Sequence, residues 1–402
     1  MVVVSHPTGN TFVRALLAGL EKRGLLTTFH TTIGFSNSNP LPFGEAARRV
    51  YELPKTKLKT HMAREVVRLV ASKAKLTGLT AHEKGWAAID NVYRDLDARV
   101  AASLAQGGDV GQPSHVYAYE DGAAATFKRA RDLGLRRVYD LPIAHWSTVR
   151  TLLREEAERY PEWEPTLQST RDSEAKLQRK DEELGLAEWI ICPSEFVARS
   201  LPPLQPTQTV VVAPFGSPPG SAERPARRHP KLRVLFAGTL SQRKGLADLF
   251  AALRLLKRPD VELIALGSAP MPLQFYHSQC AFTYESPRPH ARALDLMRTC
   301  DLLVLPSIAE GRALVQQEAM SCGLPILVTA NAGGEDLVIA GETGFIVPIR
   351  SPEAIAERLN WFADNRDALP QMGRSAQKRA AELTWDAYAS RIISGIGLQG
   401  AN

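Results

Sequence analysis

The sequence contains few cysteines, and none of them form a close pair. The four cysteines, Cys192, Cys280, Cys300 and Cys322, are far apart, and no Cys-x-x-Cys motif occurs in the 402 residues. Such spacing does not indicate a disulfide framework. We therefore interpret the four thiols as reduced structural side chains of a cytoplasmic protein.

Long apolar runs are also missing. No run approaches the 18 residues of a membrane-spanning helix. The N-terminus, MVVVSHPTGN, lacks a basic region and turns polar after four residues, so it predicts a first strand rather than a signal peptide. With 44% hydrophobic and 23% charged residues the composition is globular, and 402 residues suit two domains.

Positive charge is concentrated in one stretch. Residues 45–75 hold nine Lys or Arg and three Glu, an excess as large as the net charge of +6 on the whole chain. Val66, Val67, Leu69, Val70 and Leu76 give this stretch an apolar stripe, which indicates an amphipathic helix. Two interpretations stay open: contact with an anionic membrane surface or acceptor, and an ordinary solvated face. We expect no nucleic-acid partner and a cytoplasmic location, with any membrane association at the surface.

Strand and helix patterns alternate in both halves of the chain, which predicts an α/β protein with parallel sheets. The expected domains are an N-terminal acceptor-side domain at 1–213, a linker rich in Pro, Gly, Ser and Arg at 214–230, and a second domain at 231–384. A terminal helix at 385–402 is expected to return to the first domain. Within the second domain we expect helices at 312–321 and 335–340, and a long final helix beginning at 369. The predicted architecture is two Rossmann-like domains that face each other across a cleft.

Several polar residues of the first half follow predicted strands, where such sheets bind ligands. His6, Gly9 and Asn10 follow the strand at 2–5, but Gly9 alone is weak evidence because the motif is not GxGxxG. His6 and Asn10 could equally cap the next helix. Asp140 lies at the carboxyl end of the strand at 136–141, and His145 lies just past it. They could orient or deprotonate a hydroxyl, or simply form a turn.

An Asp-Leu-Asp sequence, Asp95 to Asp97, superficially resembles a metal-binding motif. It falls in the middle of a predicted helix rather than on a loop at a strand end. We therefore expect no metal site there, and no cofactor elsewhere.

Residues 303–323, LVLPSIAEGRALVQQEAMSCG, predict a strand, a turn and a helix that starts near Arg312. Glu310 and Glu318 are spaced as E-x7-E, with one carboxylate at the helix start and the other deeper. Free N–H groups at this helix end, from Gly311 to Val315, favour an anion. The spacing fits a grip on a sugar nucleotide, and also fits an ordinary turn with two solvated glutamates.

The second half resembles the C-terminal domain of the family-4 retaining glycosyltransferases, the glycosyl transferases group 1, which have the GT-B fold. The residues that carry the resemblance are FAGTLSQRKGLADLFAAL (236–253), DLLVLPSIAEGRALVQQEAMSCGLPILVT (301–329) and AGGEDLVIAGETGFIVP (332–348). They occur in the family's order and spacing over roughly 160 residues. The first half resembles the family only loosely.

The resemblance implies roles for single residues. Glu310 would contact the hydroxyls of the donor sugar, Glu318 would hold the ribose, and Lys244 would pair with the diphosphate. An Arg common in the family is replaced by Thr239, and Arg243 is the candidate for the missing cation. The remaining donor-side residues implied by the resemblance, with Gly9 and Asn10 added from the first strand end, are Gly238, Gly311, Arg312, Ala313, Leu314, Gly333 and Gly334.

Arg312 stands where the family often has Phe, so it could contact a phosphate or turn toward solvent. The loop at 284–290 lies where the family reads the nucleotide base. Its residues do not identify the base.

The implied reaction is transfer of a hexose-like sugar from a nucleotide-diphosphate sugar to an unknown acceptor hydroxyl. Retention of configuration and independence of metal are implied too. Asp140 and His145, with Glu310, Lys244 and Arg243, are the catalytic candidates. The alternatives are a nucleotide-sugar epimerase or phosphorylase, and a non-catalytic module that binds a sugar nucleotide.

Overall fold

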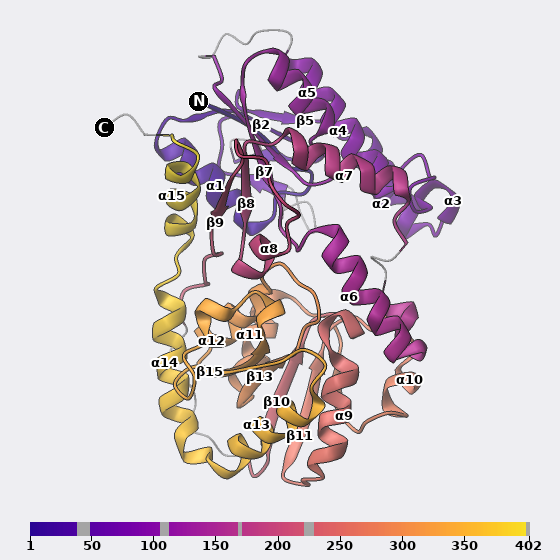
Figure 1. The fold of residues 1–402 in the computed structure, drawn as a ribbon, viewed down its shortest axis with the longest axis vertical. Coiled ribbons are helices and arrows are strands. Elements are labelled where there is room, and N and C mark those ends of the chain that lie inside the picture. Colours follow the sequence, from indigo (N-terminus) through magenta and orange to yellow (C-terminus); the bar gives the residue numbers. More distant parts are fainter. Residues whose placement is uncertain (38–48, 105–111, 168–170, 221–228, 399–402) are drawn as a thin grey trace.

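The computed structural model describes residues 1–37, 49–104, 112–167, 171–220 and 229–398. They form two α/β domains stacked along the long axis of the molecule (Figure 1). Each domain is built on its own parallel sheet, as the alternating pattern predicted. The sheet strands are rich in Val, Ile and Leu and are mostly buried, as expected when helices cover both faces of a parallel sheet.

The N-terminal sheet has seven strands in the order β5-β2-β1-β6-β7-β8-β9. The strands are β1 (Val2–Ser5), β2 (Leu26–Thr31), β5 (Leu58–Thr60), β6 (His115–Tyr119), β7 (Arg136–Asp140), β8 (Trp189–Cys192) and β9 (Thr209–Val212). Its helices are α1 (Thr11–Lys22), α2 (Ala63–Lys73), α3 (Thr77–Thr80), α4 (Ile89–Leu104), α5 (Ala124–Asp132), α7 (Glu174–Leu186) and α8 (Glu195–Arg199). A separate parallel pair consists of β3 (Phe35–Ser36) and β4 (Val50–Tyr51).

The C-terminal sheet has six strands in the order β12-β11-β10-β13-β14-β15. They are β10 (Leu232–Ala237), β11 (Val261–Leu266), β12 (Thr283–Glu285), β13 (Leu302–Leu305), β14 (Ile326–Thr329) and β15 (Gly344–Val347). The helices around it are α9 (Leu246–Leu256), α10 (Leu273–His277), α11 (His290–Arg298), α12 (Leu314–Ser321), α13 (Pro352–Asp364) and α14 (Leu369–Ala381), with short 3-10 turns η4 (Gln242–Lys244), η5 (Ala330–Ala332), η6 (Glu335–Leu337) and η7 (Arg366–Ala368).

The chain crosses between the domains more than once. Helix α6 (Trp146–Arg159) leaves the N-terminal sheet and runs down beside the C-terminal domain (Figure 1). The following 3-10 segment η2 (Pro161–Thr166) inserts Trp163 into the C-terminal core, where its ring packs against Phe250 and Tyr276. The C-terminal domain therefore contains a segment from within residues 1–213.

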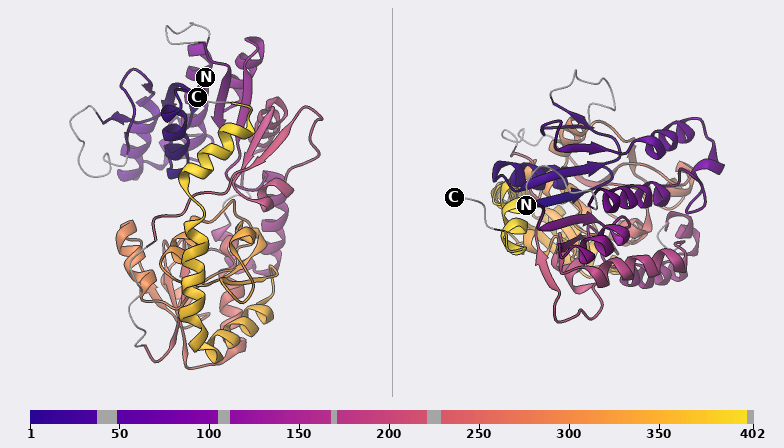
Figure 2. Two further views of the ribbon diagram at one scale, coloured as in Figure 1. Left: turned by 90° about the vertical axis from the view of Figure 1, so that its left-hand side faces the viewer. Right: turned by 90° about the horizontal axis from the view of Figure 1, so that it is seen from above.

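The last helix, α15 (Trp385–Gly395), makes the return crossing. It lies along the N-terminal domain, as both views of Figure 2 show. Tyr388, Ile392 and Ile393 are buried in the same apolar cluster as Leu16 and Leu20 of α1. Residues 214–220 and α15 thus join the domains on one side of the molecule, while α6 joins them on the other.

Some sequence expectations about the elements were wrong. The expected helix at 335–340 is only the 3-10 turn η6, because the Ile339 N–H bonds to Thr343 Oγ1 (2.7 Å) instead of continuing a helix. The expected single helix from 369 is broken before Trp385, since Thr384 caps α15 by accepting from the Ala387 N–H (3.0 Å).

The basic stretch at 45–75 is not one amphipathic helix. Its first residues, up to 48, lie outside the described part of the chain, and its middle forms β4 and β5. Among its described residues the α-helical part is α2, and the N-cap Met62 with Val66 and Val70 of α2 forms an exposed apolar stripe on successive turns. Among the described residues no helix is long and apolar enough to cross a membrane.

Candidate functional site

The candidate site is built on the turn between β13 and α12. Buried β13 ends at Leu305, and the turn brings Glu310 opposite the 3-10 turn η4 that precedes α9. Lys244 Nζ lies 2.5 Å from Glu310 Oε1, and Arg243 Nη1 lies 2.9 Å from the same oxygen. The structure therefore brings together three of the residues that the sequence selected, from two separate strand ends.

Glu310 is held as a carboxylate. Its burial disfavours ionisation, but the charges of Arg243 and Lys244 more than offset this and lower the pKa of Glu310 to about 2. Arg243 also donates to the Ala309 carbonyl (3.0 Å), and its own carbonyl accepts from the Ile308 N–H (2.9 Å). The RKG sequence thus holds the Glu310 turn as well as placing two cations beside it.

A cavity of about 310 Å³ opens next to this ion cluster. We call it the C-terminal cavity, and its walls include Gly238, Lys244, Arg288, Leu314 and Glu318. Gly238 has a φ of +141°, and a Cβ there would lie 2.8 Å from Lys244 Cε. Glycine at this position therefore lets the lysine stem cross the end of β10 and bring its ammonium group to the cavity.

Helix α12 begins at Leu314, two residues later than the sequence predicted. The reason is that the Ala313 N–H bonds to the Ala332 carbonyl (3.2 Å), which holds this part of the turn in an extended conformation. Among the described residues, the N–H groups of Leu314 and Val315 have no hydrogen-bond partner, and both residues line the C-terminal cavity. This end of the helix favours an anion, as expected.

Glu318 lies on α12, in the wall of the cavity. Its Oε1 is 3.0 Å from Nε2 of His290, the first residue of α11. Pro287 and Arg288 of the loop at 284–290 line the same cavity. The E-x7-E pair is therefore split, with Glu310 at the cations and Glu318 on the side of the 284–290 loop.

Arg312 does not have either of the positions that the sequence suggested. It neither faces solvent nor lines the C-terminal cavity, since its side chain is fully buried. It forms a bidentate pair with Asp336 (2.7 and 3.1 Å) and donates to Gln317 Oε1 (2.9 Å) and the Gly333 carbonyl (3.0 Å). Its guanidinium group therefore joins α12 to the glycine loop, and sequence reasoning missed this role because Asp336 lies 24 residues away.

The glycines of the site are required by close backbone contacts. A Cβ on Gly311 would lie 1.7 Å from the Pro142 carbonyl oxygen of the N-terminal domain. A Cβ on Gly333, whose φ is +74°, would lie 2.1 Å from the Gly311 carbonyl oxygen. Gly334 instead faces a side chain, and a Cβ there would lie 2.1 Å from Gln316 Oε1. These glycines allow the turn, the glycine loop and the opposite domain to touch.

The N-terminal domain contacts the Glu310 turn directly. Ser194, the N-cap of α8, donates through Oγ to the Gly311 carbonyl (2.6 Å), and the Ala144 N–H donates to the Glu310 carbonyl (3.4 Å). Sequence analysis did not select Ser194 as a site residue. Its position at the carboxyl end of β8 was the signal that could have marked it as a cleft residue.

Asp140 and His145 flank the loop that carries Pro142 and Ala144. Asp140 is buried beside Tyr117, and burial raises its pKa to about 7, with Tyr117 opposing and Glu120 adding to the rise. His145 caps α6 by accepting from the Ser147 N–H (3.4 Å), and burial lowers its pKa. In the described part of the chain, neither side chain lines the C-terminal cavity.

The residues after β1 form a separate loop. His6 accepts from the Thr8 and Gly9 N–H groups (3.2 and 3.0 Å), so it shapes the loop instead of capping α1. Burial and the charge of Arg49 lower the pKa of His6 to about 3. Asn10 is the N-cap residue of α1 but makes no side-chain cap bond. Neither Gly9 nor Asn10 is in the wall of the C-terminal cavity.

Thr239 is the remaining candidate on the donor side. It accepts a hydrogen bond from Ser268 Oγ (3.3 Å) at the ends of β10 and β11. Its short side chain supplies no cation, so the positive charge at this point comes from Arg243 and Lys244.

The acidic pair that resembles a metal motif has structural partners. Asp95 and Asp97 lie within α4, as expected. Asp97 accepts from the Ala125 and Thr126 N–H groups (2.7 and 2.8 Å) at the start of α5, and Asp95 pairs with Arg99 (2.9 Å). Among the described residues, one other group could hold a metal, namely His82, Glu83 and Asp172, where Lys176 Nζ lies 3.0 Å from Asp172.

Comparison with known proteins finds similarities in the second half of the chain. Residues 221–379 match the family described as glycosyl transferases group 1. A D-inositol 3-phosphate glycosyltransferase of Corynebacterium glutamicum is 30% identical over 176 residues, which cover 40% of this chain and 42% of that protein. One of Streptomyces coelicolor is 40% identical over 96 residues, 24% of this chain and 21% of that protein. These matches span less than half the length of each relative.

Solved structures extend the likeness to the whole chain. A sucrose-phosphate synthase of Thermosynechococcus elongatus has a TM-score of 0.63 at 17% identity, covering 98% of this chain and 97% of that one. HepE of Anabaena, in complex with UDP and glucose, has a TM-score of 0.59 at 16% identity, with 98% of both chains covered. The chain therefore has the GT-B fold, and its residues 221–379 are similar to the glycosyl transferases group 1 family.

Proposed function

We propose that the protein is a glycosyltransferase that moves a hexose-like sugar from a nucleotide-diphosphate sugar to an acceptor hydroxyl. The observation that carries the proposal is the position of Lys244, which lies in the wall of the C-terminal cavity and 2.5 Å from Glu310. The cavity wall contains a cation, open helix N–H groups and the Glu318 carboxylate, and the Glu310 carboxylate pairs with that cation. This set matches the phosphates and hydroxyls of such a donor.

In the proposed reaction, the acceptor oxygen forms a bond to the anomeric carbon while the bond from that carbon to the β-phosphate oxygen breaks. The nucleoside diphosphate leaves, and the acceptor hydroxyl loses its proton. Lys244 and Arg243 stabilise the negative charge that grows on the departing diphosphate. Because no side chain has been assigned as a nucleophile, we propose attack on the face from which the diphosphate leaves, with retention and without an essential metal.

The ion cluster suggests how the donor enters. Without a diphosphate, the charges of Lys244 and Arg243 are balanced by Glu310. A bound diphosphate would share these cations and leave the Glu310 carboxylate, which stays ionised, to accept bonds from the sugar hydroxyls. Glu318 would similarly exchange His290 for the ribose hydroxyls.

Related folds support a nucleotide-sugar donor. HepE of Anabaena was solved with UDP and glucose, and the trehalose-6-phosphate enzyme of E. coli with UDP-2-fluoro glucose. UDP-sugars are therefore the first donors to test here. On the opposite side, Asp140 and His145 remain the acceptor-side candidates, since the loop between them contacts Glu310 and Gly311.

We further propose a peripheral contact with anionic membranes through the described part of residues 45–75. Met62, Val66 and Val70 leave 45%, 44% and 60% of their surface exposed, one helical turn apart, and Lys73 and Lys75 are exposed nearby. Lys57 contributes less, because it pairs with Glu21 (2.7 Å). An apolar stripe next to lysines is typical of a surface that lies on a charged bilayer.

The test of the transferase is release of nucleoside diphosphate from a panel of nucleotide sugars, with and without acceptors. We expect turnover that is abolished by Glu310→Ala and reduced at least a hundredfold by Lys244→Met. Lys378→Met, which removes an exposed lysine from α14, is the matched control and should be active. Donor binding without turnover would favour the non-catalytic module. Phosphate-dependent cleavage of the sugar would favour a phosphorylase, and an epimerised sugar would favour an epimerase.

A further inference from the structure

A histidine and two carboxylates from separate parts of the chain meet in the N-terminal domain. His82 and Glu83 belong to the segment between α3 and α4, and Asp172 lies just before α7. His82 Nε2 is 3.2 Å from Glu83 Oε1 and 3.1 Å from Asp172 Oδ1. The ligand atoms that the three side chains offer all lie within 4.8 Å of one another, so they could hold one metal ion. We call these three residues the His82 cluster.

The separations within the His82 cluster fit a tetrahedral metal site. Zinc binds imidazole nitrogen and carboxylate oxygen at about 2.0–2.2 Å, so two ligand atoms of one tetrahedral ion lie about 3.3–3.5 Å apart. The two distances from His82 Nε2 are close to this value, and small side-chain rotations would place an ion between the three atoms. One imidazole and two carboxylates, with water in the fourth position, are a suitable ligand set for zinc.

A further carboxylate, Asp90, lies at the other nitrogen of the His82 ring. Asp90 is buried, with 4% exposure, and its Oδ2 has no hydrogen-bond partner among the described residues. This oxygen lies 3.7 Å from His82 Nδ1. A histidine that binds a metal through one ring nitrogen usually donates the N–H of the other nitrogen to a carboxylate or carbonyl group. Asp90 Oδ2 therefore provides the acceptor that would hold the ring with Nε2 turned toward an ion.

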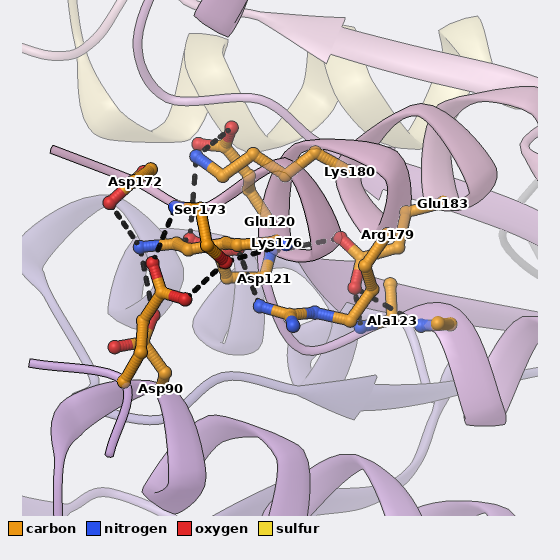
Figure 3. A network of polar contacts seen from close by, with 12 residues as sticks. Asp90, Glu120, Asp121, Ala123, Asp172, Ser173, Lys176, Arg179, Lys180 and Glu183 are labelled. Atoms are coloured by element: carbon orange, nitrogen blue, oxygen red, sulfur yellow. Dashed lines mark hydrogen bonds and ion pairs between the residues drawn. The ribbon is translucent and has the colours of Figure 1, made fainter. Parts of the chain in front are cut away.

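The ion pairs around the His82 cluster leave an excess of negative charge. Lys176 Nζ contacts Asp90 (2.8 Å) and Asp172 (3.0 Å), which approach it from two sides (Figure 3). The network continues through ion pairs among Asp121, Arg179, Lys180 and Glu120. Counted with Glu83, it contains five carboxylates and three cations. A divalent cation would balance the two negative charges in excess.

The existing contacts of the two carboxylates leave room for an ion. A carboxylate has two oxygens and about four acceptor sites, so Asp172 can pair with Lys176 and bind a metal at the same time. Glu83 Oε1 accepts a hydrogen bond from the Ser173 N–H (2.8 Å) and has a second lone pair for an ion. The side chain of His82 is 48% exposed, so an ion and its water ligand can enter from solvent.

We propose that His82, Glu83 and Asp172 form a structural zinc site, with Asp90 as the carboxylate that orients His82. Asp172 follows η2, whose Trp163 is buried in the C-terminal core. An ion at Asp172 would therefore fasten the chain, where it returns to the N-terminal domain, to the segment before α4. Within the described chain, none of the three ligands lines the C-terminal cavity, so the zinc site is independent of the proposed transfer reaction. Such a site would differ from the sequence expectation of no metal, because its ligands come from distant parts of the chain.

The test is calorimetric titration of the full chain with zinc chloride, after treatment with a chelator and its removal. We expect one Zn²⁺ per chain with a dissociation constant below about 10 µM. Zinc should also raise the melting temperature of the unchanged protein by at least about 2 °C, because an ion that binds the folded chain stabilises it. Weaker or absent zinc binding would overturn the proposal, and binding without a rise in melting temperature would overturn the structural role.

Variants locate the ion. His82→Gln and Asp172→Asn should each weaken zinc binding at least about thirtyfold, and Asp90→Asn should weaken it about tenfold without changing the stoichiometry. His277→Gln, which changes an exposed histidine of α10, is the matched control and should bind zinc as the unchanged protein does. Unchanged binding by both His82→Gln and Asp172→Asn, or an equal loss in the control, would overturn the location. Unchanged binding by Asp90→Asn would overturn the orienting role of Asp90.

Cobalt gives a readout that the loss of an ion pair alone would not change. Co²⁺ bound at the His82 cluster should show the visible absorption bands of tetrahedral coordination by nitrogen and oxygen. We expect these bands to be lost in His82→Gln and kept in His277→Gln. Identical bands in the unchanged protein and in His82→Gln would overturn coordination by the imidazole.

Discussion

Gln242 donates through Nε2 to Glu156 Oε2 at 2.5 Å, and this bond joins α6 to the turn that carries Arg243 and Lys244. Gln242 is fully buried, and its Nε2 also donates to Asp248 (2.9 Å), while its Oε1 accepts from the Ala247 N–H (2.8 Å). Glu156 is fully buried too, and Arg350 Nε lies 2.5 Å from its Oε1. The turn that carries Lys244 is thus positioned by a helix that begins in the other domain.

Replacing Gln242 should therefore impair donor use before it impairs folding. We expect Gln242→Ala to raise the KM for the nucleotide sugar about tenfold or more, because the amide no longer fixes the Arg243–Lys244 turn. Gln242→Glu should raise this KM further, because it adds a buried carboxylate beside Glu156 and Asp248. Steady-state kinetics with donor varied at saturating acceptor measure the effect.

The control for this prediction is Glu155→Gln, which alters the exposed neighbour of Glu156 on the same helix and the same Arg350. It should leave the donor KM within twofold. If Gln242→Ala changes thermal stability but not the donor KM, the glutamine has only a structural role.

The ion pair between Arg312 and Asp336 can be used to test whether Arg312 stabilises the fold without contacting a ligand. Removing the carboxylate with Asp336→Ala should lower the free energy of unfolding by about 1–3 kcal/mol, because the buried guanidinium loses its bidentate partner. The 36% exposure of the Asp336 side chain keeps this decrease in stability moderate. Chemical denaturation measures the loss. Glu382→Ala, which removes the more exposed partner of Arg379, should cost less than about 1 kcal/mol.

Affinity for UDP distinguishes Arg312 from the cations of the site. We expect the salt dependence of UDP binding to fall with Lys244→Met and to stay unchanged with Asp336→Ala at temperatures where that variant is folded. A fall in both variants would mean that Arg312 contributes to phosphate binding.

Asp140 should make stability depend on pH. Its pKa is raised from 3.8 to about 7 in the folded protein, chiefly by burial, so the fold favours its protonated form. This contribution is complete below pH 3.8 and is lost as the pH rises through about 7. The predicted loss is at most about 4 kcal/mol, since one pKa unit corresponds to about 1.4 kcal/mol.

The measurement is the free energy of unfolding of the unchanged protein relative to Asp140→Asn, from about pH 4 to about pH 8. We expect the unchanged protein to lose stability relative to the variant over this range, and the exposed Asp367→Asn control to show no such trend. A flat difference for Asp140→Asn would show that the carboxyl group is ionised throughout.

The membrane proposal is tested by co-sedimentation with vesicles rich in phosphatidylserine. Val66→Asp combined with Val70→Asp should reduce binding by more than half, because both side chains are exposed on one face of α2. Leu255→Asp changes a side chain of similar exposure, 54%, on α9 and should bind as the unchanged protein does. Equal loss in both variants, or no binding to these vesicles, would contradict the proposal.

The sequence alone determined where most strands lie along the chain and which polar residues follow them. Buried β-branched and leucine-rich runs predicted most sheet strands, and the E-x7-E spacing placed Glu310 and Glu318 on a strand–turn–helix. These features are local, because hydrophobic period and turn chemistry act over a few residues. Short elements such as β12 and β5 were missed for the same reason, since three residues carry too little pattern.

Only the tertiary structure decided which distant residues act together. The pairs Gln242–Glu156, Arg312–Asp336 and Ser194–Gly311 join residues 86, 24 and 117 positions apart, and no spacing in the chain indicates them. The burial of Arg312 and the paired cations around Glu120 follow from packing between elements that are far apart in the sequence but adjacent within one domain. Residue types selected the candidates, and long-range contacts decided which of them line the C-terminal cavity and which support its walls.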